Sequence, residues 1–353
     1  MRNLVRCAAL CLVAFGAAHA ADGEVSAADT LLLAGDKAED KVTVFRVVDG
    51  RLTALARIGT GNDPEDIVIT ADGRTAYVGN AGDDTITVLD LAALKAVRTL
   101  SNPRLQPLPQ NSAPVPFGLA VSPDGQKLYV AGRAHGVLLI MSTAGQVLGE
   151  VPVAHISSVA ISPDGSRVFA VSYQSQKLVA IDTRTNAVIG SVAAGAQPKG
   201  ISFTPDGKTL ILGLVQHDAV QFIDTQTLAV KAVIGPGRSP QSSAVSTDGQ
   251  LAFVGTRDVI DGNVLSHIAV VDLRNDRYRR AQSYLVGTML QRVAVSSDGA
   301  YLYATCRSFY DPEGSLAVMD LRTMELVQFV AAGAKALGIA IRTGSSGPRA
   351  SRS

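Results

Sequence analysis

Three side chains in this sequence of 353 residues have the chemistry of a hydrolytic site. Glu65 and His155 could exchange protons with a substrate, because a carboxylate and an imidazole are common general acids and bases. Arg292 could hold an anionic group, because a guanidinium can donate two parallel hydrogen bonds to a carboxylate or phosphate. The three residues are far apart along the chain, so they form a site only where the fold brings them together.

Other reactive groups point less clearly to chemistry. Cys306 could be a nucleophile if a histidine reached it, although a packed and inert thiol is the simpler interpretation. The histidines show no i,i+4 or short-range pairing, which predicts no metal site, while carboxylates lining a channel could still hold Ca²⁺. No glycine-rich phosphate loop follows a strand and opens a helix, and the sequence predicts no cofactor.

A recurring turn shows which elements must position these residues. The phrase "SPDGQKLYVAG" at 122–132 returns as "SPDGSRVFAVS" at 162–172 and as "TPDGKTLILGL" at 204–214. Its proline presets the turn, its Asp can bond its own backbone, and its Gly accepts the positive φ that closes a hairpin. Asp-Gly pairs of this repeat begin at Asp72, Asp124, Asp164, Asp206, Asp248 and Asp298. Their spacing defines a unit of about 42 residues with insertions in two places.

Each unit contains four short apolar runs separated by turn residues. One unit reads "SSVAIS", "RVFAVS", "KLVAID" and "AVIGSVA", and such runs are too short and too rich in Val and Ile for helices. Four strands per repeat are typical of a β-propeller blade. Six units start near Pro64, Pro116, Ile156, Pro198, Pro240 and Leu290.

A seventh unit is divided between the two ends of the chain. Residues 335–342 begin a unit that lacks its other strands, and residues 30–35, 41–47 and 52–58 could supply them. The sequence therefore predicts an all-β protein, a seven-bladed β-propeller of four-stranded antiparallel blades over residues 27–342. The ring would close where the C-terminal strand joins the three N-terminal strands, leaving no free sheet edge there. Residues 343–353 would form a disordered tail.

One position of the repeat differs from blade to blade in a way that scaffold residues do not. The residues seven before each turn Asp, with one placed by its flanking glycine, are Glu65, Phe117, Ser157, Lys199, Gln241, Gln291 and Leu337. They differ in charge, size and polarity, which is expected of side chains that line a binding site at the central channel. The alternative is that they are simply solvated around a water-filled channel.

Long loops and basic side chains are predicted at the same mouth of the channel. The segments 101–115, 257–267 and 307–315 lengthen the loops on that face, and loops carry function more often than framework does. The basic residues expected there are Arg133, His135, His155, His217, Arg238, Arg257, Arg292 and Arg307. They favour an anionic ligand, unless each arginine pairs with a neighbour such as Asp66, Asp218, Asp258 or Asp311. The predicted ligand-binding set is Glu65, Phe117, His155, Lys199, His217, Gln241, Arg292 and Arg307.

The repeat resembles a known family. "SPDGQKLYVAG" and "ADGRTAYVGNAGDDTITVLDL" are similar to the surface-layer type YVTN β-propeller repeat of exported bacterial and archaeal proteins, and more loosely to the lactonase-like seven-bladed propellers. The resemblance implies the fold over about residues 27–342, and lactonase-like propellers use His, Glu and Arg for lactone hydrolysis. Met141 and Ser142 replace the Asp that ends the third strand of other units, so a different turn is expected there.

The N-terminus and the charge balance limit the function classes. Residues 1–20 combine basic residues, a short apolar run and a small-x-small end, which predicts a signal peptide cleaved after Ala20 and a periplasmic or secreted protein. Removing them leaves a net charge of −1 and Cys306 as the one cysteine, so no internal disulfide can form. No later apolar run is long enough to span a membrane. A net charge near zero and a low aromatic content argue against nucleic-acid binding.

Two functions remain open at this level. The first is an exported monomeric propeller that recognises a small anionic molecule, or an envelope or secreted protein partner, at its long-loop face. The alternative is a lactonase-like hydrolase or isomerase acting on a sugar or aromatic lactone, with Glu65, His155 and Arg292 as the candidate catalytic residues.

Overall fold

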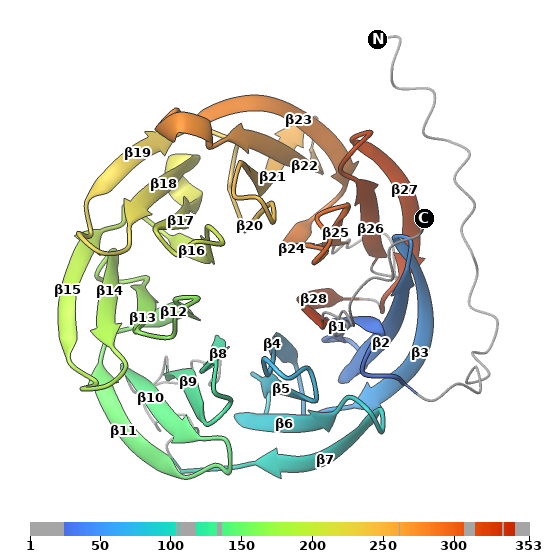
Figure 1. Cartoon of the computed structure of the whole chain (residues 1–353), viewed down its shortest axis with the longest axis vertical. Coiled ribbons are helices and arrows are strands. Elements are labelled where there is room, and N and C mark those ends of the chain that lie inside the picture. The colour runs from blue at the N-terminus through green and yellow to red at the C-terminus, as the bar shows by residue number, and fades with distance from the viewer. Residues whose placement is uncertain are drawn as a thin grey trace, which may run out of the picture.

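The computed structural model describes residues 25–103, 105, 118–132, 136–260, 262–306, 315–333 and 335–342. These residues form seven four-stranded antiparallel sheets, and Figure 1 shows the sheets arranged as the blades of a ring. The predicted fold class, an all-β seven-bladed propeller, is thus confirmed. No helix in the described ranges is both long and apolar enough to cross a membrane.

In six blades the four strands follow chain order from the ring axis outward. Two of the connections between strands contain a short 3-10 helix. Blade 1 contains β4 (Pro64–Ile69), β5 (Thr75–Asn80), β6 (Thr85–Asp90) and β7 (Lys95–Leu100). Blade 2 contains β8 (Leu119–Val121), β9 (Lys127–Gly132), β10 (Val137–Ser142) and β11 (Val147–Pro152). Blade 3 contains β12 (Ile156–Ile161), β13 (Arg167–Ser172), β14 (Lys177–Asp182) and β15 (Val188–Ala193).

The next three blades repeat this order. Blade 4 contains β16 (Pro198–Phe203), β17 (Thr209–Leu214), η1 (Val215–His217), β18 (Ala219–Asp224) and β19 (Val230–Ile234). Blade 5 contains β20 (Ser242–Val245), β21 (Leu251–Ile260), β22 (Asn263–Asp272), η2 (Arg274–Asp276) and β23 (Arg279–Gly287). Blade 6 contains β24 (Leu290–Val295), β25 (Tyr301–Cys306), β26 (Ser315–Asp320) and β27 (Glu325–Ala331).

The closing blade joins the two ends of the described chain, as predicted. Its order is β28 (Ala336–Arg342), β1 (Thr30–Asp36), β2 (Lys41–Val48) and β3 (Arg51–Gly59), with β28 antiparallel to β1. The buried Asp36 fixes the start of β28, because its Oδ1 accepts hydrogen bonds from the backbone N–H of Lys335 at 3.1 Å and of Ala38 at 2.9 Å. Arg342 fixes the other end, donating to the carbonyl oxygens of Ser26 and Asp29.

The repeated Asp-Gly turn is structural, and in blade 5 it lies at the opposite end of β21 from the hairpin that joins β21 to β22. In blade 3, Asp164 Oδ1 accepts hydrogen bonds from Ser162 Oγ at 2.6 Å and from the N–H of Ser166 at 3.0 Å, while Gly165 has a φ of 72°. The Ser162 hydroxyl, followed by the Ser166 N–H, holds the pKa of Asp164 below its usual value. A glycine is needed at the positive φ, which explains why the motif recurs.

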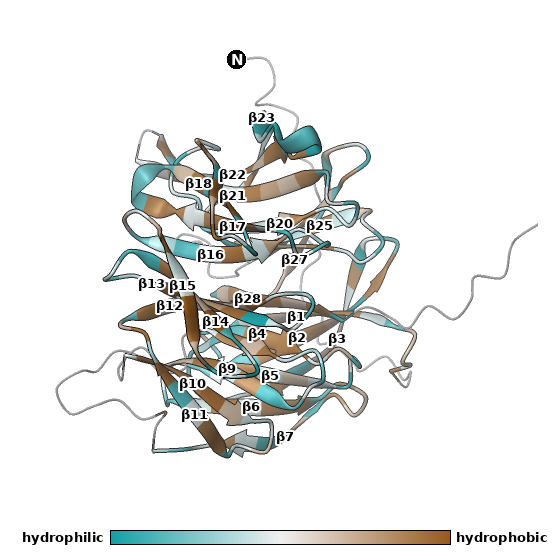
Figure 2. Ribbon diagram, turned by 60° about the vertical axis from the view of Figure 1, so that its left-hand side comes forward, coloured by the Kyte–Doolittle hydropathy of each residue, from teal (hydrophilic) through white to brown (hydrophobic). Residues whose placement is uncertain are grey.

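The core lies between neighbouring blades, as well as within each of them. Phe169 of β13 is fully buried and packs with Leu210 and Leu212 of β17, and its ring lies 5.6 Å from that of Phe203 in β16. Burying one such side chain contributes about 2 kcal/mol. Figure 2 shows apolar colour concentrated on the strands and polar colour on the connecting turns, so the blades are held by packing between sheets.

The turn in blade 2 differs from the others, as the missing Asp predicts. In blade 3, Asp182 Oδ1 accepts from the N–H groups of Arg184 and Thr185, and the chain then turns through Asn186 at a φ of 58°. In blade 2, the N–H of Gly145 instead bonds the carbonyl oxygen of Ser142 at 2.9 Å, which makes a shorter turn.

One expected loop is wrong. Residues 257–267 were expected as a loop, but β21 and β22 extend through them as a hairpin, with Arg257 opposite Ser266 and Ile260 opposite Asn263. The sequence carries the signal for this hairpin, because "VIDGNV" places an Asp-Gly pair between apolar residues. Arg257 therefore projects from a strand, which fixes its backbone more firmly than a loop would. The other two long segments fall largely (101–115) or almost wholly (307–315) outside the described residues.

Candidate functional site

The innermost strands begin with irregular backbone at the ring axis. His155 and Gln197, which precede β12 and β16, have left-handed φ values of 46° and 52°. The strand register then skips Glu65 in β4, Ser157 in β12 and Gln291 in β24. Bulges of this kind re-aim side chains and are common next to binding sites. Three of the predicted channel positions therefore lie at bulges.

A small cavity at the ring axis brings together residues from five blades. Its lining is Glu65, Ser157, Ser158, Lys199, Gly200, Gln291, Arg292 and Leu337. Five of the seven predicted channel positions are among them. Gln241 lies next to this cavity instead, and Phe117 falls outside the described residues.

A second hollow of about 360 Å³ adjoins the axial cavity. It is lined by Ser157, Tyr173, Gln197, Pro198, Lys199, Val215, Ser239, Gln241 and Arg257. Ser157 and Lys199 line both spaces, so we treat the two together as the central chamber. Pockets of a few hundred Å³ are the size that small-molecule ligands occupy.

Lys199 is the charged residue that lines both parts of the central chamber. Its Nζ donates a hydrogen bond to Gln241 Oε1 at 3.1 Å, and Gln241 is itself held by the carbonyl and hydroxyl oxygens of Ser239. Burial, followed by the positive charges of Arg292 and Arg257, lowers the pKa of Lys199 to about 8, against the opposing effect of Glu65. Three cationic side chains thus face the same space.

Glu65 is already held by a residue that sequence reasoning missed. Lys37 Nζ lies 2.9 Å from Glu65 Oε2 and 3.5 Å from Asp63 Oδ2. Lys37 lies in the loop between β1 and β2, which corresponds to the loops after the second strand in the other blades. The sequence could have indicated Lys37 through this position, because loops after the second strand were expected at the mouth of the channel.

Arg292 and Arg257 differ in how they are held. Arg292 Nη2 lies 3.8 Å from Asp66 Oδ1, and Asp66 Oδ2 accepts the N–H of Leu119 at 3.0 Å. Burial raises the pKa of Asp66, and the positive charge of Arg292 opposes that rise. Arg257 Nε donates to the carbonyl oxygen of Leu290 at 2.6 Å. Asp66 was one of the acidic partners predicted for the arginines, and its distance from Arg292 is long for an ion pair.

The remaining predicted residues lie outside the lining of the chamber. His155 is partly buried at the start of β12 and lines neither part of it, so the structure brings Glu65 and Arg292 to the chamber without His155. His217 ends η1, where its Nδ1 accepts the N–H of Ala196 at 3.3 Å, and the carbonyl oxygen of Arg238 accepts the N–H of Arg257. The candidates outside the described residues are Phe117, Arg133, His135 and Arg307.

Comparison with known proteins places this arrangement in a family. A model of the YNCE-like β-propeller family matches residues 4–345. The chain belongs to the YNCE-like β-propellers. No curated protein sequence matches it significantly.

Solved structures share the fold of this YNCE-like propeller at low sequence identity. A functionally unknown protein from Desulfotomaculum acetoxidans is 17% identical with a TM-score of 0.72, covering 88% of this chain and 98% of its own. A 6-phosphogluconolactonase-like protein from Bacteroides uniformis is 16% identical with a TM-score of 0.71, covering 89% and 100%. The match to hydrazine synthase from Kuenenia stuttgartiensis has 17% identity, a TM-score of 0.64 and coverages of 80% and 96%. At these identities the likeness concerns the fold.

Cys306 of this YNCE-like propeller is a packed thiol. Its side chain is buried, and its Sγ lies 3.9 Å from the carbonyl oxygens of Val286 and Ala304. Burial raises the pKa of Cys306 to about 12, which Arg257 only partly opposes. A thiol that stays protonated is a poor nucleophile. Within the described ranges, no group of three or more His, Cys, Asp or Glu residues could hold a metal ion.

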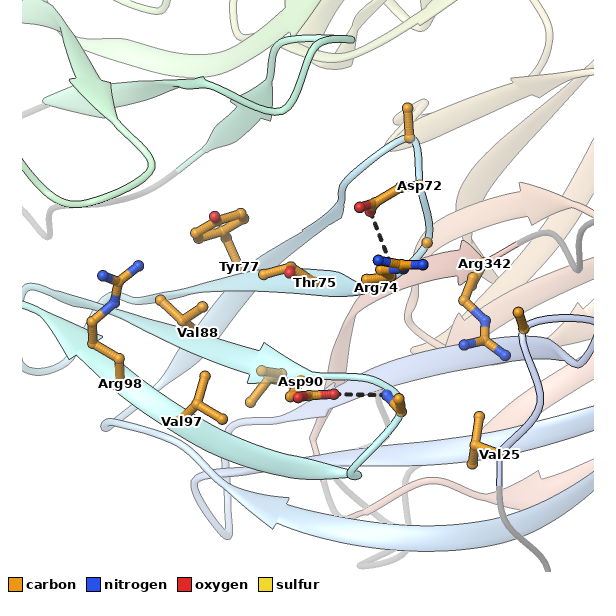
Figure 3. A pocket seen from close by; sticks show the side chains of 15 residues that line it. Val25, Asp72, Arg74, Thr75, Tyr77, Val88, Asp90, Val97, Arg98 and Arg342 are labelled. Atoms are coloured by element: carbon orange, nitrogen blue, oxygen red, sulfur yellow. Dashed lines mark hydrogen bonds between the residues drawn. The ribbon is translucent and has the colours of Figure 1, made fainter.

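A larger hollow of about 1170 Å³ lies beside the Asp-Gly turn of blade 1 and the turn that follows β6. Figure 3 shows Tyr77 and Arg98 at one end of it and Arg342 and Val25 at the other. Its acidic groups are occupied by turn hydrogen bonds, from the N–H of Arg74 to Asp72 and from the N–H of Ala92 to Asp90. The central chamber, where charged groups from different blades converge, is the better candidate site.

Proposed function

We propose that this YNCE-like propeller is an exported binding protein whose central chamber takes a small anionic ligand. The observation that carries the proposal is the convergence of Lys199, Arg257 and Arg292 on one partly buried space. Like charges held together in a desolvated site raise each other's free energy, and an anion placed between them relieves that repulsion.

The arrangement of the carboxylates supports the same proposal. Among the described residues that line the chamber, Glu65 is the acidic one, and Lys37 already holds it at 2.9 Å. Asp66 bonds a backbone N–H and stands 3.8 Å from Arg292. Neither carboxylate therefore neutralises Lys199 directly, and the chamber keeps a positive character that favours a carboxylate or phosphate.

The proposal is tested by calorimetric titration with a panel of small carboxylates and phosphates at pH 7. We expect at least one to bind the wild type, and Lys199→Gln to weaken it by about tenfold, the usual effect of one desolvated charged hydrogen bond. Lys208→Gln is the matched control, because Lys208 is exposed on the opposite face. No binding across the panel would contradict the proposal and redirect attention to a protein partner.

A second variant tests the role of Lys37. Lys37→Met frees the Glu65 carboxylate, whose negative charge would then act more strongly on the chamber. We expect the affinity for the same anion to fall about threefold to tenfold. An affinity that is unchanged or higher would contradict the assigned electrostatics while leaving the Lys199 result intact.

A lactonase-like activity is the second candidate, because solved neighbours include 6-phosphogluconolactonase-like propellers and because Glu65 and Arg292 line one cavity. It is tested by assaying the purified mature protein on sugar and aromatic lactones beside Glu65→Gln and Arg292→Gln. Turnover by the wild type that is lost in the variants would support it. Absence of turnover by the wild type would exclude it for that panel.

Export is the part of the proposal that rests on residues 1–20, which lie outside the described residues. Expression of the full chain in a bacterial host should yield a mature protein that begins at Ala21. N-terminal sequencing of the periplasmic or culture fraction checks this, and an intact N-terminus confined to the cytoplasm would contradict it.

A further inference from the structure

Lys199 is an amine placed where a small molecule can reach it. It lines both parts of the central chamber, and its Nζ is bonded to a neutral amide oxygen. Within the described part of the chain, no carboxylate oxygen is recorded within 4 Å of that nitrogen. An ammonium that lacks a carboxylate partner in a desolvated space loses its proton more readily than an exposed one.

Two guanidinium groups line the central chamber together with this amine. Burial is the main reason why the pKa of Lys199 falls to about 8, and the positive charges of Arg292 in β24 and Arg257 in β21 contribute to that fall. A lysine that is desolvated or placed next to another cation becomes a nucleophile toward carbonyl compounds near neutral pH. The same guanidinium groups could bind a carboxylate attached to the carbonyl carbon.

We propose that Lys199 forms a reversible imine with a small anionic carbonyl compound of the 2-oxo acid class, held by Arg257 and Arg292. This inference rests on the proposed function, because it takes the anion-binding chamber as given and names the class of ligand. The hollow of about 360 Å³ suits an acid of a few carbon atoms.

The reaction balances without any further reagent. The neutral amine of Lys199 adds to the carbonyl carbon, and proton transfers through solvent give a carbinolamine. Its hydroxyl oxygen then leaves as water, which carries away both hydrogen atoms of the original amine, and a carbon–nitrogen double bond remains. No electrons are exchanged with another molecule, and hydrolysis reverses the sequence.

The surrounding charges favour this product in the chamber. The carboxylate of the 2-oxo acid would offset the positive charges of Arg257 and Arg292, which both act on Lys199. Gln241, held in place by Ser239, offers its Oε1 at 3.1 Å from Nζ and so limits the directions in which the amine can point. Positioning of this kind reduces the entropy that is lost when the two reacting groups meet.

The experiment uses pyruvate as the probe and borohydride to reduce the imine. Peptide mass spectrometry of the full-length protein should find Lys199 heavier by one pyruvic acid molecule less one oxygen atom. Labelling of Lys199 should exceed that of the exposed Lys208 by about tenfold or more. Lys199→Arg keeps the positive charge and should abolish the label at this position, whereas Lys208→Arg should leave it unchanged.

Lactate, which lacks the carbonyl group, separates the two proposals. If lactate and pyruvate both bind in calorimetry but Lys199 is not labelled, the imine is overturned and anion binding stands. If neither acid binds and Lys199 is not labelled, both fail for this class of ligand. If Lys199→Arg keeps the melting temperature of the wild type, loss of the label is not caused by loss of folding. Labelling found only on another lysine would also overturn the proposal.

Discussion

Lys199 is a residue whose charge the fold disfavours. Its folded pKa of about 8 lies below the ordinary lysine value of 10.5, mainly because of burial. Below pH 8 both the folded and the unfolded chain carry this proton, so the folded state bears the full unfavourable free energy of the buried charge. Between pH 8 and 10.5 the unfolded chain binds more protons, so this contribution to stability improves as the pH rises. Groups kept in spite of such a disadvantage are typical of functional sites.

Replacing this residue should therefore stabilise the protein at neutral pH. We expect Lys199→Met to raise the free energy of unfolding by about 2 kcal/mol at pH 7. A pKa lowered from 10.5 to about 8 corresponds to about 3 kcal/mol, and the lost hydrogen bond to Gln241 offsets about 1 kcal/mol of it. Urea unfolding at pH 6 to 10 measures the difference from wild type, which should shrink above pH 8. Arg257, Arg292 and Glu65 face this position in both proteins, so their own contributions largely cancel.

A matched substitution shows whether the effect belongs to the chamber. Lys208→Met removes an exposed lysine and should change the free energy of unfolding by less than about 0.5 kcal/mol at every pH. A Lys199→Met protein that is less stable than wild type at pH 7 would mean that the amine is solvated or paired, against the placement described above.

At the scale of the element, the joint between β28 and β1 depends on one close approach. Gly333 has a φ of 105°, and a Cβ added there would lie 2.0 Å from Asp36 Oδ2. Asp36 is the residue that accepts the N–H of Lys335 and so fixes the start of β28. Any side chain at position 333 must displace this carboxylate or the strand.

Gly333→Ala should destabilise the protein by about 3 kcal/mol, because it adds the displacement of Asp36 to the strain of a positive φ. Gly262→Ala is the matched control, since Gly262 also has a positive φ of 79° but nothing lies within 4 Å of the added Cβ. Thermal unfolding of both variants measures the difference. Equal losses of stability would show that the contact with Asp36 adds nothing.

Elements were more predictable from the sequence than contacts. The Asp-Gly period, the four runs per unit and the strands at the two chain ends predict the blades and the closure, because each depends on local turn chemistry and alternation. The hairpin at 257–267 was missed because its Asp-Gly pair falls outside the period. The contact of Lys37 with Glu65 could not be predicted, because it joins residues of two blades whose side-chain reach depends on the curvature of the ring. The period of the repeat placed Lys199 at the channel. It could not show that Arg257, on an extended strand, and Arg292, beside a bulge, would act on the same amine.

At the scale of the whole molecule, the ring is held closed by a single strand from its C-terminal end. Deleting residues 335–353 removes β28, uncovers the edge of β1 and exposes the core residues of the closing blade. We expect loss of cooperative thermal unfolding and aggregation, measured by circular dichroism and size-exclusion chromatography. Deleting only residues 345–353 leaves β28 in place and should move the melting temperature by less than about 2 °C. A well-folded monomer from the longer deletion would contradict the role given to β28.

The closing blade also constrains the order of events during biosynthesis. Because β1 can find its inner neighbour only after residue 336 has been made, a growing chain carries an unfinished first sheet through the whole of translation. Domains that mature from their N-terminus can fold while the ribosome is still working, but this ring cannot complete any closed form until its last strand emerges. For a chain exported as proposed, that delay keeps the polypeptide open long enough to be threaded through a narrow translocation pore, and the ring would then form on the far side of the membrane.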